Sequence, residues 1–238
     1  GFGNALEPDC RAPGTQPGTI EVALRMLHDA DAWDEDLAGG ACDWLQHHAP
    51  AEGGAILVDP SIAGWPHAPW WEPQPGLPPS LVAAGQIAGT LHARKVDHPW
   101  LTEATAWLWS TIEGLTSAFG YEMRGAIRFL NYVPDPDRAL AALDRMGELM
   151  LDLGLVVLEP GTPGDGATPL DYAPNPDDRA RRLFDGTVIQ AHLDYLAGGQ
   201  QEDGGWTFPW PEWSPAATAE WRGAVTVDAL RVLKANGR

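Results

Sequence analysis

Apolar residues recur at helical spacing along most of this chain, and this periodicity constrains the fold more than any other feature. Between residues 17 and 31, Ile20, Ala23, Leu24 and Leu27 follow the i, i+3, i+4, i+7 pattern of one helix face. The short apolar run at 55–58 is the one tempting strand. The sequence therefore predicts an all-α fold. The expected helices cover 17–31, 79–94, 98–114, 120–132, 135–153, 178–198 and 215–236.

The length, composition and net charge of the chain limit which kinds of fold and which binding partners it can have. The 238 residues are 44% hydrophobic, which is enough for one folded core. The net charge of −18 argues against nucleic acid and anionic membrane, because both select for Lys and Arg. No apolar run is long enough to span a bilayer. We expect a single domain over residues 1–238 that binds no nucleic acid and does not insert into a membrane.

The two cysteines, Cys10 and Cys42, form neither a disulfide framework nor a metal-binding spacing. Free thiols are typical of a reducing compartment, so a cytoplasmic location is expected. No cofactor is expected.

A weak internal repeat links two parts of the chain. Trp44-Leu45 precedes Glu52-Gly53-Gly54, and Tyr195-Leu196 precedes Asp203-Gly204-Gly205 at the same spacing. Glycine tolerates the positive φ with which a helix end reverses direction, and a flat aromatic just beyond can cover that end. Gly1-Phe2-Gly3 is similar to the tail of another such turn, so we expect the natural protein to carry at least one more helix before it.

The later copy resembles a known motif. Gln200-x-x-x-Gly204-x-Trp206, preceded by Tyr195-Leu196, is similar to the QW motif of the terpene cyclase and protein prenyltransferase superfamily. The stretches GFG and LEPD, PHAPWW at 66–71, and DGGW and EWRG near the end are similar to small, single-domain bacterial members. The resemblance implies an α/α toroid, with inner and outer helix layers of about four to five helix pairs around a cavity. It also implies that Gln200 and Trp206 tie helix ends together and are structural.

The chemical motifs of that superfamily are missing. The acidic stretch 29–36 lacks the Asp-x-Asp-Asp spacing of cyclases that protonate an alkene. Asp177-Asp178 is followed by Arg-Ala-Arg, which is no Asp-Asp-x-x-Asp magnesium motif and is more typical of a helix N-terminus. Neither cysteine lies in a zinc-binding setting of the prenyltransferase kind. No metal site is predicted, and the fold resemblance does not by itself give a function.

Candidate site residues lie in three settings. Some are in the long proline-rich loops at 60–80 and 159–176, since such loops are usually binding elements, and others are in the LEPDCR turn near the start and around the last turn and the start of the last helix. Carboxyls and a histidine could donate or accept protons, and tryptophan faces can stabilise cations or stack on flat ligands. A salt-bridged turn, a packed histidine and tryptophans that fill gaps between helices are the structural alternatives. The candidate acid–base groups are Glu7, Asp9, His67 and Asp171. The candidate substrate-binding residues are Arg11, Trp65, Trp70, Trp71, Tyr172, Trp210, Trp213, Glu220, Trp221 and Arg222.

We expect these stretches to converge on one mouth of the toroid cavity. Three functions are then open. The favoured one is an enzyme of the cyclase, isomerase or lyase type, acting on an apolar small molecule, with isoprenoids as one candidate class. The second is a carbohydrate-active α/α barrel with two carboxylates at a glycosidic bond. The third is a binding module for an apolar or aromatic small molecule, without catalysis.

Overall fold

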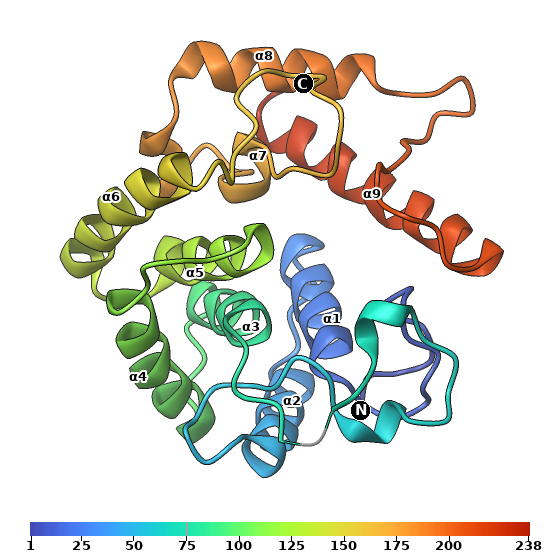
Figure 1. The fold of residues 1–238 in the computed structure, drawn as a ribbon, viewed down its shortest axis with the longest axis vertical. Helices are drawn as coiled ribbons and strands as arrows, with labels where there is room; N and C mark the ends of the chain where they lie inside the picture. The colour runs from blue at the N-terminus through green and yellow to red at the C-terminus, as the bar shows by residue number, and fades with distance from the viewer. Residues whose placement is uncertain (75) are drawn as a thin grey trace. The chain divides into compact units, whose positions relative to one another are not determined.

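The computed structural model describes residues 1–74 and 76–238. Within these residues the chain forms nine α-helices and three short 3₁₀ turns without a strand, which confirms the all-α prediction (Figure 1). The nearest approach to a sheet is one isolated bridge between Cys10 and His67. The helices fall into two compact units, residues 1–142 and 143–238.

The helices of unit 1 surround α3. This helix is apolar on nearly all sides, and it packs against α1, α4 and α5, while α2 packs against α1 and α4. A helix without a polar face is stable only when its neighbours cover it, so α3 forms the centre of unit 1. The elements are α1 (Pro17–Asp29), α2 (Glu35–His48), α3 (Leu81–Ala93), α4 (Pro99–Glu113) and α5 (Gly120–Tyr132).

Glycines allow α3 and α5 to touch backbone to backbone. A Cβ atom added to Gly85 would lie 2.3 Å from the carbonyl oxygen of Gly125, and one added to Gly125 would lie 2.2 Å from that of Leu81. Gly89 has a similarly close neighbour in the carbonyl oxygen of Arg128, at 2.7 Å. No larger residue fits at these three positions without moving one helix.

Several helix boundaries follow the local signals. Ser80 caps α3 through a hydrogen bond that its hydroxyl accepts from the amide of Ala83, and α9 (Pro215–Ala235) ends at Asn236 before Gly237, whose φ is +73°. The sequence prediction did not include α2, because Gly39 and Gly40 interrupt its apolar pattern.

The helix predicted over 178–198 is wrong in its first part. Residues Arg179–Leu183 form a 3₁₀ turn, and Phe184 is extended, with φ −127° and ψ 138°. A new helix, α8 (Gly186–Gly198), begins only after Asp185. Likewise, no strand forms at 55–58.

Unit 2 has its own apolar core. Helix α6 (Pro136–Asp152) crosses the boundary between the units along the chain, and α7 (Pro169–Tyr172), α8 and α9 follow. Helix α8 packs against both α7 and α9. The buried core residues are Leu170, Ile189, Leu193, Trp206, Ala229, Val232 and Leu233.

The predicted helix-end cover is confirmed at Trp206. Its indole is buried and donates a hydrogen bond of 2.8 Å to the carbonyl of Leu196, near the C-terminus of α8. Gln200 donates to the carbonyl of Gly204, which has a φ of +85°. In the earlier copy of the repeat, Trp100 similarly donates to the carbonyl of Gly54 at 3.0 Å. Both indoles thus donate to a backbone carbonyl at or near a glycine turn, and the carbonyl of Leu196 also accepts from the amide of Gly199.

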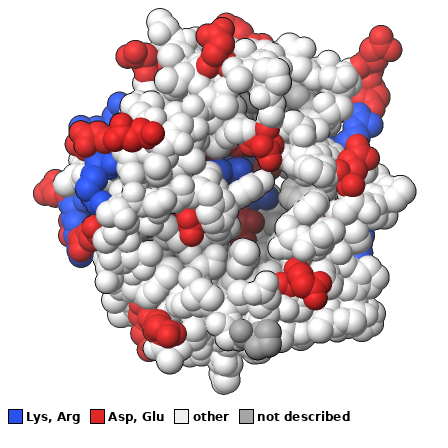
Figure 2. All heavy atoms as spheres, in the orientation of Figure 1, with Lys and Arg blue, Asp and Glu red and all other residues white. Residues whose placement is uncertain are grey.

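In the part of the chain that the structure describes, no helix is long and apolar enough to cross a membrane. Cys10 and Cys42 are both buried and form no disulfide. On the face shown in Figure 2, acidic side chains lie at separate places with uncharged surface between them. The same described residues contain no group of three or more His, Cys, Asp or Glu arranged to hold a metal ion.

Candidate functional site

The structure brings together two of the predicted stretches, LEPDCR near the start and PHAPWW in the first long loop. The amide of Ala68 donates to the carbonyl of Asp9 at 2.8 Å, and the amide of Arg11 donates to that of Pro66 at 2.9 Å. The bridge between Cys10 and His67 lies between these two bonds. Residues far apart in sequence therefore form one short antiparallel ladder.

Two carboxyls are buried at this junction. The exposed fractions of Glu7 and Asp9 are 6% and 4%. The amide of Asp9 donates to Oε2 of Glu7 at 2.8 Å, and the indole Nε1 of Trp70 donates to Oδ2 of Asp9 at 2.9 Å. We call these three residues the Glu7 cluster.

Burial changes the proton affinity of Glu7. Burial and, after it, the nearby charge of Asp9 together raise the pKa of Glu7 to about 8, against the hydrogen bond from the Asp9 amide. Glu7 is therefore a neutral carboxylic acid at pH 7. A carboxyl that keeps its proton at neutral pH is the property that a general acid requires.

The backbone before Glu7 is held in an unusual shape. Asn4 and Ala5 have φ values of +57° and +63°, a left-handed conformation that is uncommon for residues other than glycine. The amide of Asn4 donates to the carbonyl of Ala12, and the amide of Cys10 to that of Glu7. These bonds close a compact loop around Glu7, whose side chain accepts from the Asp9 amide. Strained backbone of this kind is found often at functional sites.

His67 lies in the same ladder but makes other contacts. Its Nδ1 is 2.7 Å from the carbonyl oxygen of Trp65, so this nitrogen carries the proton and donates it. Its Nε2 is 3.0 Å from Oε2 of Glu72, a residue that the sequence analysis did not select. Both ring nitrogens are engaged, and His67 would have to release Glu72 before it could exchange a proton with a substrate.

The three tryptophans of the loop have different environments. Trp71 packs its ring against Gly18 at the start of α1. It also covers a small buried apolar cluster formed by Cys10, Ala12, Val58 and Ile62. Trp65 and Trp70 are about half exposed, at 48% and 47%. Trp70 is thus half exposed while its Nε1 bonds to a buried carboxyl.

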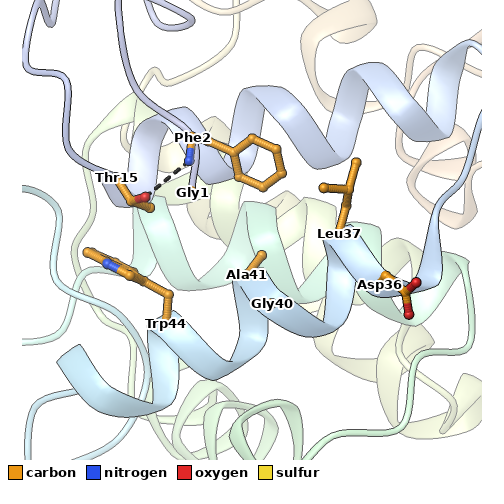
Figure 3. A pocket seen from close by; sticks show the side chains of 8 residues that line it. All are labelled: Gly1, Phe2, Thr15, Asp36, Leu37, Gly40, Ala41 and Trp44. Atoms are coloured by element: carbon orange, nitrogen blue, oxygen red, sulfur yellow. Dashed lines mark hydrogen bonds between the residues drawn. The ribbon is translucent and has the colours of Figure 1, made fainter.

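A small pocket lies near the start of the chain, between the first residues and α2. Phe2 donates its amide to the Thr15 hydroxyl at 3.0 Å, and its ring points toward Leu37 on α2 (Figure 3). The pocket has a volume of about 110 Å³, well below the roughly 300 Å³ at which ligand pockets usually begin. It is too small for a substrate of the predicted kind.

The candidate residues of the second long loop lie in unit 2 and make structural contacts there. Asp171 accepts hydrogen bonds from the amide and the hydroxyl of Thr168, at 2.8 and 2.7 Å, and so caps α7. Tyr172 is buried and donates its hydroxyl to the carbonyl of Leu155 at 2.7 Å.

The candidates around the last turn also lie in unit 2. Trp210 stacks on Phe208 and meets Trp221 edge to face, with ring centroids 5.2 Å apart in the second pair. Arg222 donates to Asp203 at 2.7 Å and so braces the turn before Trp206. Trp213 directly precedes the Ser214 cap of α9, and Glu220 is exposed on that helix. The predicted convergence of these residues with the Glu7 cluster stays a prediction.

Sequence reasoning missed one further feature, a groove of about 500 Å³ within unit 1. It is lined by residues of α3, α4 and the turns that follow α3 and α5, among them His92, Thr105 and Trp109. His92 is a lone histidine in a nearly apolar helix. This was the one sequence signal that could have pointed to the groove.

Comparison of this chain with protein-family models, with curated proteins and with solved structures finds no match.

Proposed function

We propose that this protein is a small-molecule enzyme that acts by acid–base chemistry on an apolar, unsaturated substrate, with Glu7 as the acid. The observation that carries the proposal is the Glu7 cluster, a buried carboxyl with a pKa of about 8 next to a second carboxyl and a half-exposed indole. Desolvation and a neighbouring carboxylate are the means by which enzymes hold an acid protonated at neutral pH.

The proposed reaction is an isomerisation or cyclisation. Glu7 gives its proton to one carbon of an alkene, whose π electrons form the new C–H bond and leave a cation on the neighbouring carbon. The face of Trp70 stabilises that cation through its ring electrons. Loss of a proton from an adjacent carbon to the Glu7 carboxylate forms the new double bond and restores the acid, so that atoms and charge balance.

The toroid arrangement is part of the same proposal. Its support is the succession of helices and the QW-like contact at Trp206. A cytoplasmic location is proposed with it. Isoprenoids are the substrate class that the resemblance to terpene cyclases favours.

Incubation in D₂O with linear isoprenoid alkenes and alcohols tests the reaction. Protonation by Glu7 would place deuterium on carbon in the recovered compound or its isomer, which mass spectrometry detects. Glu7→Gln should abolish incorporation, because the amide has no acidic proton. Glu52→Gln is the matched control, since Glu52 is exposed in a turn of the same unit and lies outside the cluster, and it should leave incorporation unchanged.

Two results would contradict the proposal. Incorporation that persists in Glu7→Gln would show that another group donates the proton. Tight retention of a co-purifying apolar compound, with no deuterium uptake in any variant, would favour the non-catalytic binding module.

A further inference from the structure

The groove in unit 1 combines an apolar wall with one oriented polar group. Leu101, Trp109 and Val133 are buried and form part of its lining. Thr105 contributes a hydroxyl from α4, and His92 an imidazole from α3. A volume of about 500 Å³ lies within the range of pockets that hold small molecules.

His92 is held in one orientation. Its Nε2 lies 2.8 Å from the Thr105 hydroxyl, and its ring meets that of Phe129 at a centroid distance of 5.8 Å. Among the described residues, Nδ1 of His92 has no hydrogen-bond partner. Burial lowers the pKa of His92 to about 4, so the ring is neutral at pH 7. One nitrogen is thus anchored, and the other can exchange a hydrogen bond with a neutral group.

The other histidine of the groove is already occupied. His98 accepts from the amide of Trp100 through Nδ1 at 3.1 Å, and its Nε2 lies 3.2 Å from a carboxylate oxygen of Asp43. It caps α4 and orients no ligand.

The charged side chains that line the groove lie at its rim. Lys95, Asp97 and Asp135 are exposed, and Asp135 accepts a hydrogen bond from the amide of Arg138 at the start of α6. Arg138 also stacks on the ring of Trp109, 4.0 Å from its centroid, so two acids and two basic groups balance and favour neither sign of ligand charge. A carboxylate would lose its hydration next to the neutral imidazole, which is unfavourable. Exposed charges contribute little to the binding of a cation, while a desolvated ammonium next to a neutral imidazole would be unfavourable.

We infer that this groove is a second ligand site, separate from the Glu7 cluster, for an uncharged molecule with an aromatic or alicyclic body and one hydroxyl or amide group. The body lies against Trp109, Leu101 and Val133, and the polar group bonds to Nδ1 of His92. A hydroxyl or amide fits either tautomer of the ring, because each can both donate and accept.

A charge series tests the site. Naphthylethanol, naphthylacetate and naphthylethylamine share one apolar body and differ in their polar group. Calorimetry and amide NMR shifts on the full chain should show naphthylethanol binding with a Kd of about 1 mM or tighter, at least about tenfold tighter than the other two. The largest shifts should fall on residues 92–105 and on the indole N–H of Trp109.

Substitutions distinguish a specific site from non-specific binding to an apolar surface. His92→Phe keeps an aromatic ring and removes both ring nitrogens, and it should weaken the binding of naphthylethanol about fivefold or more, the effect of one neutral hydrogen bond. Thr105→Val releases the anchor of His92 and should act in the same direction. Thr111→Val, on the same helix but outside the groove, should change nothing. Circular dichroism checks that each variant is folded.

Three outcomes would overturn the inference. The first is a failure of naphthylethanol to bind at millimolar concentration. The second is equal or tighter binding of the carboxylate or the amine. The third is a set of shifts outside the groove, or an affinity that neither His92→Phe nor Thr105→Val reduces.

Discussion

The indole Nε1 of Trp70 donates a hydrogen bond of 2.9 Å to Oδ2 of Asp9, although the two residues are 61 positions apart. This bond joins the first long loop to the start of the chain. It also places the edge of an indole ring next to the carboxyl pair of Glu7 and Asp9.

Trp70→Phe should lower the free energy of unfolding by about 2 kcal/mol, because it leaves a carboxylate that is 4% exposed without the indole donor. Urea denaturation measures the change. Trp65→Phe is the matched control, since Trp65 is exposed to a similar extent, and its effect should stay within about 0.5 kcal/mol. Equal effects of the two substitutions would mean that the bond to Asp9 contributes nothing.

Glu7 should make stability fall as pH rises. The pKa of Glu7 is about 8 in the folded chain against 4.5 for the ordinary carboxyl, so between these values the folded state keeps a proton that the unfolded state has lost. Its contribution is full below about pH 4.5 and is lost progressively up to about pH 8.

Glu7→Gln removes this dependence and keeps an oxygen that can accept from the Asp9 amide. The difference in unfolding free energy between Glu7→Gln and the wild type should therefore shift in favour of the variant by on the order of 4 kcal/mol from about pH 5 to about pH 8. Urea denaturation at a series of pH values measures it. A constant difference would show that Glu7 titrates normally.

Trp206→Ala should lower the free energy of unfolding by about 3–5 kcal/mol, since the ring is buried in the core of unit 2 and its indole caps α8. Gln200→Ala removes an exposed bond of the same turn and should cost no more than about 1 kcal/mol. Comparable losses at both positions would argue against Trp206 as the main support of the turn.

Gly85→Ala should destabilise the chain by about 2 kcal/mol or more, because its methyl group would lie 2.3 Å from the backbone of α5. Gly39→Ala, in α2, meets no atom within 4 Å and should stabilise the chain by about 0.5–1 kcal/mol through helix propensity. Thermal unfolding of both variants tests whether α3 and α5 pack as closely as described. A neutral Gly85→Ala would contradict this packing.

The sequence by itself determined the helices and the local structure at their ends. Apolar spacing, the Ser80 cap, the Asn236-Gly237 ending and the turn before Trp206 are all signals carried by neighbouring residues, so they act whatever the rest of the chain does. Because these signals are local, they also account for the helices that the sequence analysis predicted wrongly. Two glycines interrupt the apolar spacing of α2, so the sequence analysis missed this helix. A helical pattern over 178–198 did not reveal that Phe184 is extended.

Only the tertiary structure decided which candidate residues meet and in what state. Nothing near Glu7 in sequence shows that it is buried, and its raised pKa depends on that burial and on its neighbour Asp9. The contact of Asp9 with Trp70 and that of His92 with Thr105 each join separate elements. Burial and pairing of this kind depend on how distant segments pack, and local sequence patterns do not encode that packing.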